Sequence, residues 1–560
     1  MEDLALSIIR GPSLDEEEGI GALTLGGWLR EVCAAGGASE ALVFHEDGAR
    51  ISWSYNDLWA CAQEVARALI ACGTGRGTRV GILMTNRPEF LAAVWGTALA
   101  GGVATTLNTF STTEELAYML ELSSVSVLLM ERTVLRKDFL AMLQEIEPQV
   151  ATAEPGALRS KTLPFLRHVA AVGEGEGCCE NWDAFLSRAD DTETDLVEAI
   201  ADQISPADPA VLFFSSGSTA KPKGILSAHR AVALQLWRWK RFYATGPDVR
   251  SWSANGFFFS GNFGMGIGGA LSAGGALILQ STFQPEEALD LMAREKATMA
   301  IAWPHQWAQL ASAPNWDDVD LSAMKYVSAS HAFGQHPTID TDWDEPMSAY
   351  GNTETFTISS IYPSGTSMEE RAGSSGKPQP GITFKIVDPL TGETVPVGES
   401  GEISVKGATL MMGYLGVPLD QTLDDQGFFP TGDGGHVDAQ GRLFWKGRLN
   451  DIIKTGGANV SPLEIDETIR QCPGVKLNQT VGVPDDLLGE MVVTAVVTHA
   501  GQSVSEEDVR SFASRTLASY KVPRRVLFFQ EEDLKTTGSA KIKTSDLREF
   551  AARRLADAEG

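Results

Sequence analysis

The stretch that decides how this chain is interpreted is Ser215-Ser216-Gly217-Ser218-Thr219-Ala220-Lys221-Pro222-Lys223-Gly224. It follows the apolar run 210–214, which predicts a buried strand. Its glycines let the backbone approach an anion, while its hydroxyls and lysines supply donors and positive charge. The spacing from Gly217 to Gly224 is not that of a Walker A loop, and no Lys-Ser/Thr pair opens a helix. The stretch indicates a phosphate site, with a polar surface loop as the alternative.

The composition is that of a folded protein with more than one domain. The chain has 560 residues, of which 43% are hydrophobic, and this is too long for one ordinary core. The formal net charge of −28 argues against a nucleic-acid partner or an anionic membrane surface, because both repel an acidic chain. A local cluster of donors still permits an anionic ligand.

The cysteines and the N-terminal residues predict a location. The six cysteines form no C-x-x-C pair, so free thiols in a reducing compartment are expected, and a zinc site is not. Residues 1–10 have no basic start before their short apolar run, and no apolar run reaches transmembrane length. We therefore expect neither a signal peptide nor a membrane span, and a cytoplasmic protein.

Strands and helices alternate along the first part of the chain. The pattern predicts helices near 54–69, 88–100 and 112–120, and strands at 79–84, 103–107 and 125–130. Such alternation is typical of a parallel sheet that is covered by helices on both faces.

The rest of the chain is more varied. Residues 131–205 are less regular, and segments 173–177 and 190–195 are expected to be surface loops. A β-rich part is predicted from about 372 to 447, since turn signals recur there. The residues from about 450 onward have their own αβ pattern and are long enough for a separate small domain.

Four further motifs follow the opening stretch in order. They are Tyr350-Gly351-Asn352-Thr353-Glu354-Thr355, Thr431-Gly432-Asp433, the segment 447–465 and Thr537–Ile542. Taken with 215–224, they resemble the signatures of the adenylate-forming superfamily, which contains acyl- and aryl-CoA synthetases, luciferases and peptide-synthetase adenylation domains. Any one match is weak, but five in order at domain-scale spacing make coincidence implausible.

The resemblance implies an α/β fold with two domains. The expected N-terminal domain, residues 1–449, has stacked mixed α/β sheets and a β-rich subdomain, and it carries the ATP and acyl sites. The expected C-terminal domain, residues 450–560, is small, α+β and mobile, with Asn450 at the hinge. Ala220 and Ala540 stand where the family usually has Gly, which reduces backbone freedom if a positive φ is needed there.

The resemblance also implies roles for particular residues in making an acyl-adenylate. Lys541 reaches the substrate carboxylate and phosphate oxygens, Glu354 holds Mg²⁺, and Thr353 donates to a phosphate. Asp433 accepts the ribose hydroxyls, with Arg448 supporting it. The expected ATP- and AMP-binding residues are Ser215, Ser216, Gly217, Ser218, Thr219, Lys223, Tyr350, Gly351, Asn352, Asp433 and Arg448. A plain Thr-Gly-Asp turn and a solvated lysine are the alternatives for Asp433 and Lys541.

The resemblance implies that two further segments form the acyl pocket. Three Phe residues at 257–259 and no nearby acid disfavour an amino-acid substrate and favour a hydrophobic acid that is fatty, alicyclic or aromatic. His331 either orients a polar group of the substrate or fills space in the pocket wall. The expected lining residues are Phe258, Phe259, Asn262, Phe263, Ser330, His331 and Ala332.

The second half-reaction is expected to use coenzyme A. Gly456 and Gly457 fit the face along which a pantetheine arm passes close to the backbone. The prediction is an ATP- and Mg²⁺-dependent acyl-CoA synthetase, whose sequence is compatible with a homodimer. The alternatives are an enzyme that loads a carrier-protein thiol and a non-catalytic ATP-binding module. The latter is weakened because the lysine, the acid and both ribose partners are present.

Overall fold

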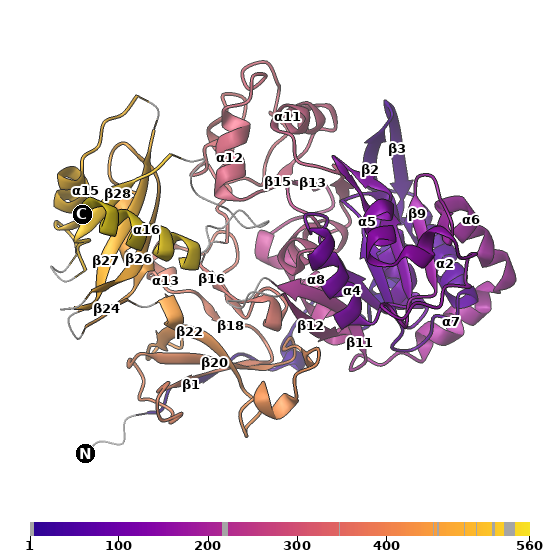
Figure 1. Cartoon of the computed structure of the whole chain (residues 1–560), viewed down its shortest axis with the longest axis horizontal. Coiled ribbons are helices and arrows are strands. Elements are labelled where there is room, and N and C mark those ends of the chain that lie inside the picture. Colours follow the sequence, from indigo (N-terminus) through magenta and orange to yellow (C-terminus); the bar gives the residue numbers. More distant parts are fainter. Residues whose placement is uncertain are drawn as a thin grey trace. The chain divides into compact units, whose positions relative to one another are not determined.

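The computed structural model describes residues 5–215, 222–346, 348–451, 453–455, 458–485, 488–499, 501–517, 521–530 and 544–559. The chain, which Figure 1 draws coloured along its sequence, divides into two compact units. Unit 1 comprises Met1–Ile9, Phe384–Val405 and Pro430–Gly560, and unit 2 comprises Arg10–Thr383 and Lys406–Phe429. The domain boundary at residue 449 and the mobility of the C-terminal domain stay predictions.

The larger sheet of unit 2 has eight strands, and its first six run parallel to one another. The last two strands are antiparallel to their neighbours. The order is β10 (Cys179–Asn181), β9 (His168–Val172), β6 (Val127–Glu131), β4 (Arg79–Leu83), β5 (Val103–Thr106), β11 (Pro209–Ser215), β12 (Lys223–Ala228) and β21 (Gly413–Tyr414).

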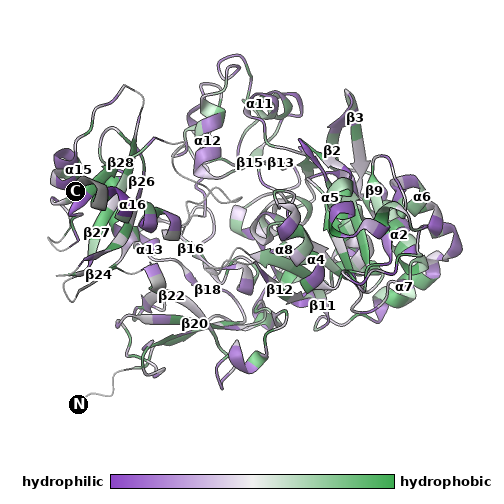
Figure 2. Cartoon of the chain, in the orientation of Figure 1, coloured by the Kyte–Doolittle hydropathy of each residue, from purple (hydrophilic) through white to green (hydrophobic). Residues whose placement is uncertain are grey.

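Helices cover both faces of this sheet, as the alternating sequence predicted. Along β6, Val127 and Leu129 pack with α1 (Leu25–Gly36), α2 (Tyr55–Ala71), α3 (Pro88–Leu99) and α8 (His229–Tyr243) in one cluster. Leu128 and Met130 pack on the other face with α4 (Thr113–Ser123) and α5 (Phe139–Ile146). Successive side chains of a strand point to opposite faces, so this split follows from the strand period of two. Figure 2 shows the strands of this sheet as mostly hydrophobic.

Local signals in the sequence set the ends of these helices. Ser54 caps α2 through a reciprocal capping box with Asp57, and Thr112 caps α4 in the same way with Glu115. Pro88 occupies the first turn of α3, where its missing N–H has no helical partner to lose.

A second sheet of unit 2 has five strands in the order β15 (Met299–Ile301), β13 (Arg250–Ser253), β14 (Ala276–Ile278), β2 (Glu40–Glu46) and β3 (Ala49–Ser54). The hairpin β2–β3 is antiparallel and the other pairs are parallel. Helix α11 (Pro285–Arg294) and α12 (Pro304–Ala311) contribute to the hydrophobic cluster that covers one face.

Two sheets belong mainly to unit 1. The first has the order β1 (Ile8–Arg10), β19 (Ile382–Val387), β20 (Gly401–Gly407), β22 (Phe429–Val437) and β23 (Leu443–Arg448). The second has β25 (Ala458–Val460), β24 (Ile453–Thr455), β27 (Gly489–Thr498) and β26 (Val475–Asp485), with β28 (Arg525–Phe528) beside β27. Three helices accompany this sheet: α14 (Pro462–Ile469), α15 (Glu506–Ala513) and α16 (Thr544–Glu559). The β-rich part and the separate αβ pattern were both predicted.

The prediction for residues 131–205 was partly wrong. Segment 173–177 has no regular helix or strand, but segment 190–195 is not a loop throughout. It includes the end of a 3₁₀ turn (Arg188–Asp191) and the start of α7 (Thr194–Asp202). Acidic residues are favoured in the first turn of a helix, and Val197 is buried, so what looked like a charged loop is a helix start.

The cysteines and helices fit two other expectations. All six cysteines are free. Burial raises the pKa of the thiols of Cys33 and Cys179 to about 12, so they are not ionised at neutral pH. Among the described residues, no helix combines the length and the apolar character that crossing a membrane requires.

A fully buried ion pair joins the start of unit 2 to α8. Arg238 donates to both carboxylate oxygens of Glu17, at 3.0 and 2.7 Å, and neither side chain is exposed to solvent. Arg241 also donates to Glu17, but its side chain is 42% exposed. Removing one member of a buried pair leaves a charge without compensation, whereas an exposed pair contributes little.

We predict that Glu17→Ala lowers the free energy of unfolding of unit 2 by about 3–5 kcal/mol, because it strands the Arg238 charge in the core. Arg241→Ala is the matched control and costs under about 1 kcal/mol. Urea unfolding followed by tryptophan fluorescence measures both, since every tryptophan except Trp445 lies in unit 2. Equal losses in the two variants would contradict the prediction.

Candidate active site

The loop that carries Thr353 and Glu354 is a tight turn between two short strands of unit 2. Strand β16 (Ala349–Tyr350) pairs with β17 (Ser360–Ile361), and Lys377–Pro378 forms the third strand, β18. Between them, a 3₁₀ turn at Thr353–Thr355 is capped by Asn352, whose Oδ1 accepts from the Thr355 N–H at 3.0 Å. The turn closes when the Thr357 N–H donates to the Asn352 carbonyl, also at 3.0 Å.

This turn depends on close backbone packing. A Cβ atom on Gly351 would lie 1.8 Å from the Thr357 carbonyl oxygen, so only glycine fits there. Phe356 and Thr357 have φ values of 47° and 78°, in the region that β-branched and bulky residues rarely adopt. Phe356 is completely buried against Phe213 and Phe263, and this packing holds the strained turn in place.

Glu354 is held by two groups of a distant segment. Its carboxylate accepts from the Tyr414 hydroxyl at 2.7 Å, and its carbonyl accepts from the Met411 N–H at 2.7 Å. The ammonium of Lys223 lies 4.8 Å from the centroid of the Tyr414 ring. Strand β21, which contains Tyr414, pairs with β12, which begins at Lys223. The structure therefore brings Glu354 to the hydroxyl and Lys223 to the ring of one tyrosine.

The opening stretch connects two antiparallel strands. Ser215 ends β11 and is paired with Lys223 at the start of β12. A strand and not a helix follows the stretch, which agrees with the prediction that it is not a Walker A loop. The predicted binding residues Ser216, Gly217, Ser218 and Thr219 lie outside the described residues, as does Ala220.

The aromatic segment after β13 lies next to the Glu354 loop. The Ser260 hydroxyl donates to the Thr353 hydroxyl at 3.4 Å, which links the aromatic segment to the residue that is expected to contact a phosphate. The rings of Phe258 and Phe259 are 4.7 Å apart, and Phe110 lies 5.9 Å from Phe258. Phe110 is 53% exposed, so this aromatic group reaches the surface of unit 2.

Two predicted pocket residues are buried within the packing. Asn262 is 1% exposed, and its side chain is bonded to the Ser253 hydroxyl and to the Asn255 carbonyl. Phe263 is completely buried and packs against Phe213 and Trp95. Both side chains are therefore packed inside unit 2.

His331 is stacked and paired in the second predicted pocket segment. Its ring lies 5.3 Å from that of Trp307 at an angle of 24°, and its Nε2 is 3.2 Å from a carboxylate oxygen of Glu345. Nδ1 of His331 is buried without a hydrogen-bond partner among the described residues. The flanking Ser330 and Ala332 are both exposed.

Burial changes the ionisation of this pair. It lowers the pKa of His331, which favours the neutral imidazole. Burial first, and then the nearby charge of Asp344, raise the pKa of Glu345 to about 7. A neutral imidazole beside a carboxyl that is partly protonated at neutral pH can both donate and accept hydrogen bonds.

The other predicted nucleotide residues lie in unit 1. Asp433 on β22 is 3% exposed and forms an ion pair with Arg448 on β23 at 3.1 Å. The Arg448 guanidinium also donates to the Thr431 carbonyl at 2.9 Å. Gly432 has a φ of 72°, and its N–H donates to Glu402. The Thr-Gly-Asp motif thus presents a buried, oriented carboxylate and is more than a plain turn.

Several other predicted residues of unit 1 lie at or beyond the edges of the described segments. Gly456, Gly457, Lys541 and Ala540 lie outside the described residues. Asn450 belongs to a 3₁₀ turn (Leu449–Asp451), and its side chain is outside the description. Burial raises the pKa of the neighbouring Asp451, although Arg448 acts in the opposite direction.

Sequence reasoning missed Tyr414, Phe110, Trp307 and Glu345. Their contacts with predicted residues are distant in sequence; Tyr414 and Glu354 are 60 residues apart. No local pattern marks these four residues, because their contacts arise only from tertiary packing.

Comparisons with known proteins agree on one family. A model described as "AMP-binding enzyme" matches residues 29–415, and one described as "AMP-binding enzyme C-terminal domain" matches residues 464–541. The putative acyl-CoA synthetase YngI of Bacillus subtilis is 28% identical over 94% of this chain and 96% of that protein. The indoleacetate–CoA ligase of Aromatoleum aromaticum is 28% identical over 90% and 94% of the two chains.

A solved structure extends the similarity to the fold. The crystal structure of the anthranilate CoA ligase AuaEII in complex with anthranoyl-AMP has a TM-score of 0.78 and 25% sequence identity. The alignment covers 95% of this chain and 98% of that one. The predicted α/β fold is therefore confirmed.

The Glu345 carboxyl gives a testable pH dependence. Its pKa of about 7 lies above the ordinary value of 4.5, so the folded protein keeps a proton that the unfolded chain releases in this range. The stability that this proton confers is complete below the ordinary value and is lost as the pH rises through about 7. Because the side chain is 32% exposed, the effect is limited to about 1 kcal/mol.

The unchanged chain is expected to lose unfolding free energy as the pH rises from about 5 to about 8. We predict that this loss is smaller by roughly 1 kcal/mol in Glu345→Gln. Glu369→Gln removes an exposed carboxyl from the same unit and serves as the control for net charge. Urea unfolding at the two pH values gives the difference. A pH dependence in Glu345→Gln that equals that of the unchanged chain would show that Glu345 is not the titrating group.

Proposed function

This chain belongs to the family of AMP-binding enzymes, and on that premise we propose that it activates a hydrophobic carboxylic acid for thioester formation. The matches confirm the predicted class, an AMP-forming acid–thiol ligase that uses ATP with Mg²⁺, a carboxylic acid and CoA. The class of acid, the role of each residue and a cytoplasmic location are part of our proposal.

The proposed reaction has two steps. A carboxylate oxygen attacks the α-phosphorus of ATP, the bond to the β-phosphate breaks, and pyrophosphate leaves. The thiol of CoA, losing its proton, then attacks the acyl carbon, and AMP leaves with the bonding electrons of the C–O bond. Negative charge builds on phosphate oxygens in the first step, so fixed cations and donors contribute most of the catalysis.

The observation that carries the proposal is the arrangement of Glu354, Tyr414 and Lys223 in unit 2. Tyr414 orients the Glu354 carboxylate and supports the Lys223 ammonium on its ring. We assign Glu354 to Mg²⁺, because carboxylate oxygens are the ligands that this ion prefers, and Lys223 to the ATP phosphates. Mg²⁺, when bound, neutralises phosphate charge. Thr353 is assigned to a phosphate oxygen, and Ser260 fixes its hydroxyl.

In unit 1, Asp433 is assigned to the two ribose hydroxyls. Its carboxylate is already oriented by Arg448, so a vicinal diol meets an acceptor that needs no rearrangement. We assign the catalytic lysine to Lys541 and passage of the pantetheine arm to Gly456 and Gly457, from their positions in the family's motifs. The order of the motifs in the sequence supports combining the residues of both units in one reaction.

The substrate is proposed to be a hydrophobic acid with an aromatic ring or an aliphatic chain. Phe110, Phe258 and Phe259 offer an aromatic surface beside Ser260, whose hydroxyl contacts Thr353. Trp307 and His331 offer a second flat surface. The names of two similar proteins, ligases for indoleacetate and anthranilate, support testing aromatic acids first. Loading of a carrier-protein thiol is the alternative.

The test is AMP release from ATP with a panel of aromatic, alicyclic and fatty acids, with and without CoA. We expect turnover that requires both an acid from this panel and free CoA. Turnover that is independent of CoA, or that needs a carrier protein, would refute transfer to CoA. The absence of AMP and pyrophosphate with every acid, despite measurable ATP binding, would favour a non-catalytic module.

A substitution of Lys541 is expected to affect the two half-reactions differently. Lys541→Ala is expected to reduce adenylation by roughly 10²–10³-fold, because a cation is lost where phosphate charge develops. Thioester formation from a supplied acyl-adenylate should stay within about twofold of the unchanged enzyme, because that step begins after pyrophosphate has left. Equal loss of both steps would rule out the role assigned to Lys541.

Tyr414 gives a sharper test of the Glu354 site. Tyr414→Phe keeps the ring below Lys223 but removes the donor to Glu354, so kcat/KM for adenylation should fall by about tenfold, with more Mg²⁺ needed for half-maximal rate. Tyr362→Phe makes the same chemical change at a buried hydroxyl without a described partner, and it is the control. An unchanged Mg²⁺ dependence in Tyr414→Phe would contradict the orienting role.

A further inference from the structure

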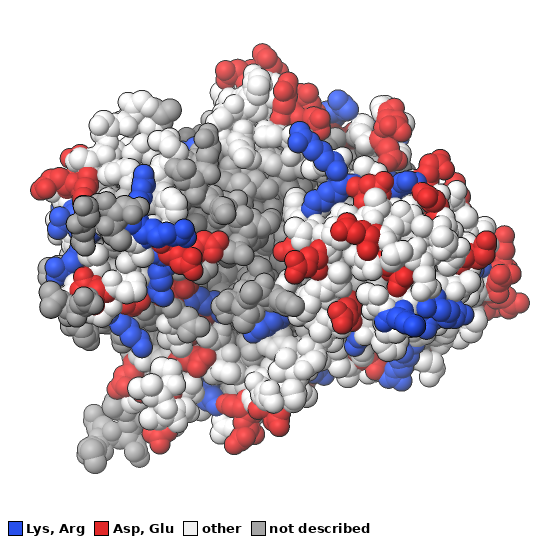
Figure 3. Space-filling model, viewed as in Figure 1, with Lys and Arg blue, Asp and Glu red and all other residues white. Residues whose placement is uncertain are grey.

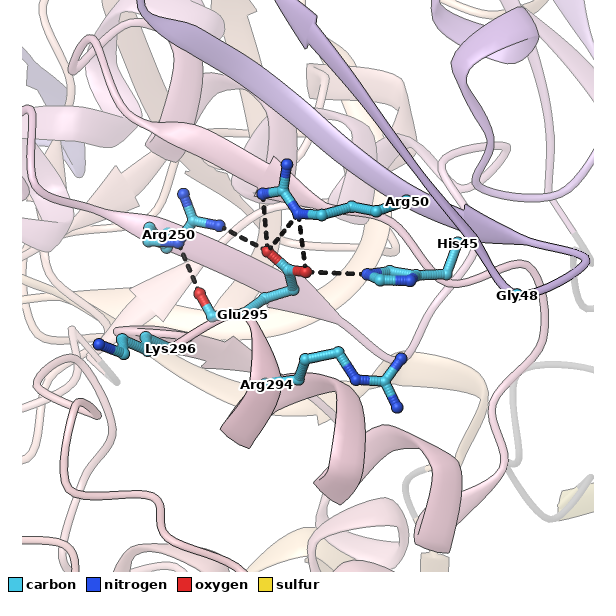
Figure 4. Close-up of a pocket in the computed structure, with 7 residues that line it drawn as sticks. All are labelled: His45, Gly48, Arg50, Arg250, Arg294, Glu295 and Lys296. Atoms are coloured by element: carbon cyan, nitrogen blue, oxygen red, sulfur yellow. Dashed lines mark hydrogen bonds and ion pairs between the residues drawn. The ribbon is translucent and has the colours of Figure 1, made fainter.

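A basic pocket of unit 2 lies outside the residues assigned to the reaction. It has a volume of about 720 Å³ and is formed by the β2–β3 hairpin, the start of β13 and the end of α11 (Figure 4). Its charged lining residues are His45, Arg50, Arg250, Arg294, Glu295 and Lys296. We call it the β2–α11 pocket. Figure 3 shows basic side chains gathered between the positions of α11 and β2 on the face drawn.

A single buried carboxylate fixes the cations on one side of the pocket. Glu295 is 7% exposed and accepts from His45 at 2.8 Å, from Arg50 at 2.8 and 3.0 Å and from Arg250 at 3.1 Å. Burial alone would raise the pKa of Glu295, but the hydrogen bonds from Arg50 and His45 outweigh it and hold the pKa below its usual value. The two guanidinium groups are thus held in fixed positions before any ligand arrives (Figure 4).

The pocket has more positive charge than its own carboxylates neutralise. Glu40 and Glu295 pair with Arg50 and Arg250, and this leaves the four groups with no net charge. Arg294 and Lys296 are exposed and make no ion pair or hydrogen bond with another described side chain. Nη1 of Arg50 also makes no hydrogen bond within the described residues. A surplus of two positive charges therefore remains, in a chain whose formal net charge is −28.

The helix dipole of α11 explains a positive charge at Arg294 but not at Lys296. Arg294 lies in the last turn of α11, where a positive charge is favoured by the helix dipole. Lys296 lies beyond the helix with a φ of 51°, a position at which glycine or asparagine is normally preferred. Lysine is not the residue that this backbone position favours, so the end of the helix does not by itself explain Lys296.

We propose that the β2–α11 pocket binds the phosphate group of a small molecule. A phosphate dianion matches the surplus of two charges, and its tetrahedral oxygens suit guanidinium donors from Arg50 and Arg294 together with the ammonium of Lys296. A single carboxylate would leave one charge unmatched. The phosphate comes either from free inorganic phosphate and pyrophosphate or from a nucleotide or coenzyme that carries a phosphomonoester.

The test uses the full chain with Arg294→Gln/Lys296→Gln, which leaves the Glu295 hydrogen bonds intact. The control is Arg136→Gln/Lys161→Gln, which removes the same charge elsewhere in unit 2. Calorimetric titrations use inorganic phosphate, pyrophosphate and adenosine 3′,5′-bisphosphate, each alone, and the double variant separates binding at the pocket from binding elsewhere. Hydrogen exchange with and without each anion locates the binding.

We expect at least one of these anions to bind the unchanged chain and to protect segments 45–50 and 294–296 from exchange. The Arg294→Gln/Lys296→Gln variant should bind it about tenfold or more weakly, while the control variant binds as the unchanged chain does. Tighter binding of pyrophosphate identifies a product of the reaction as the ligand, and tighter binding of the bisphosphate identifies a nucleotide.

Two results would overturn the proposal. One is equal binding in the unchanged chain and the Arg294→Gln/Lys296→Gln variant. The other is the absence of protection in the two pocket segments. Neither measurement requires turnover of a substrate, so failure here is distinguishable from failure of the proposed enzymatic function.

Discussion

The close approach of Gly351 to the Thr357 carbonyl is the constraint on which the candidate active site depends. No side chain fits between them, and the turn they close places Thr353 and Glu354 beside Ser260 and Tyr414. The unfavourable φ values of Phe356 and Thr357 are tolerated because Phe356 is anchored in the core of unit 2. Hydrophobic packing thus stabilises a strained turn, and the strained turn orients the polar groups.

Much of the fold follows from local patterns in the sequence. The period-two strands, the capping boxes at Ser54 and Thr112 and the proline at the start of α3 act within a few residues, so they can be recognised without a structure. The acidic start of α7 was misread as a loop because acidic residues favour both solvent and helix N-termini. Composition alone does not distinguish the two.

The candidate site was predicted less completely, and the reason is physical. Motifs within one turn, such as Tyr350–Thr355 and Thr431–Asp433, can be read from the sequence because their residues are adjacent. Tyr414 and Glu345 act through contacts that only tertiary packing creates, and no periodicity marks them. The hydrogen bonds of Asn262 to Ser253 and Asn255 are also contacts that spacing could not reveal, and its place in a pocket wall stays a prediction.

The position of β21 at the edge of the eight-stranded sheet has a consequence for synthesis of the chain. Strand β12 ends at Ala228, but its outer neighbour begins only at Gly413. At roughly 5–20 residues per second, a ribosome needs on the order of 10–40 s to make the intervening chain. During that interval the outer edge of β12 has no strand to pair with and is open to pairing with other chains. Glu354 is also synthesised before Tyr414, which donates a hydrogen bond to it, so the site is completed only late in translation.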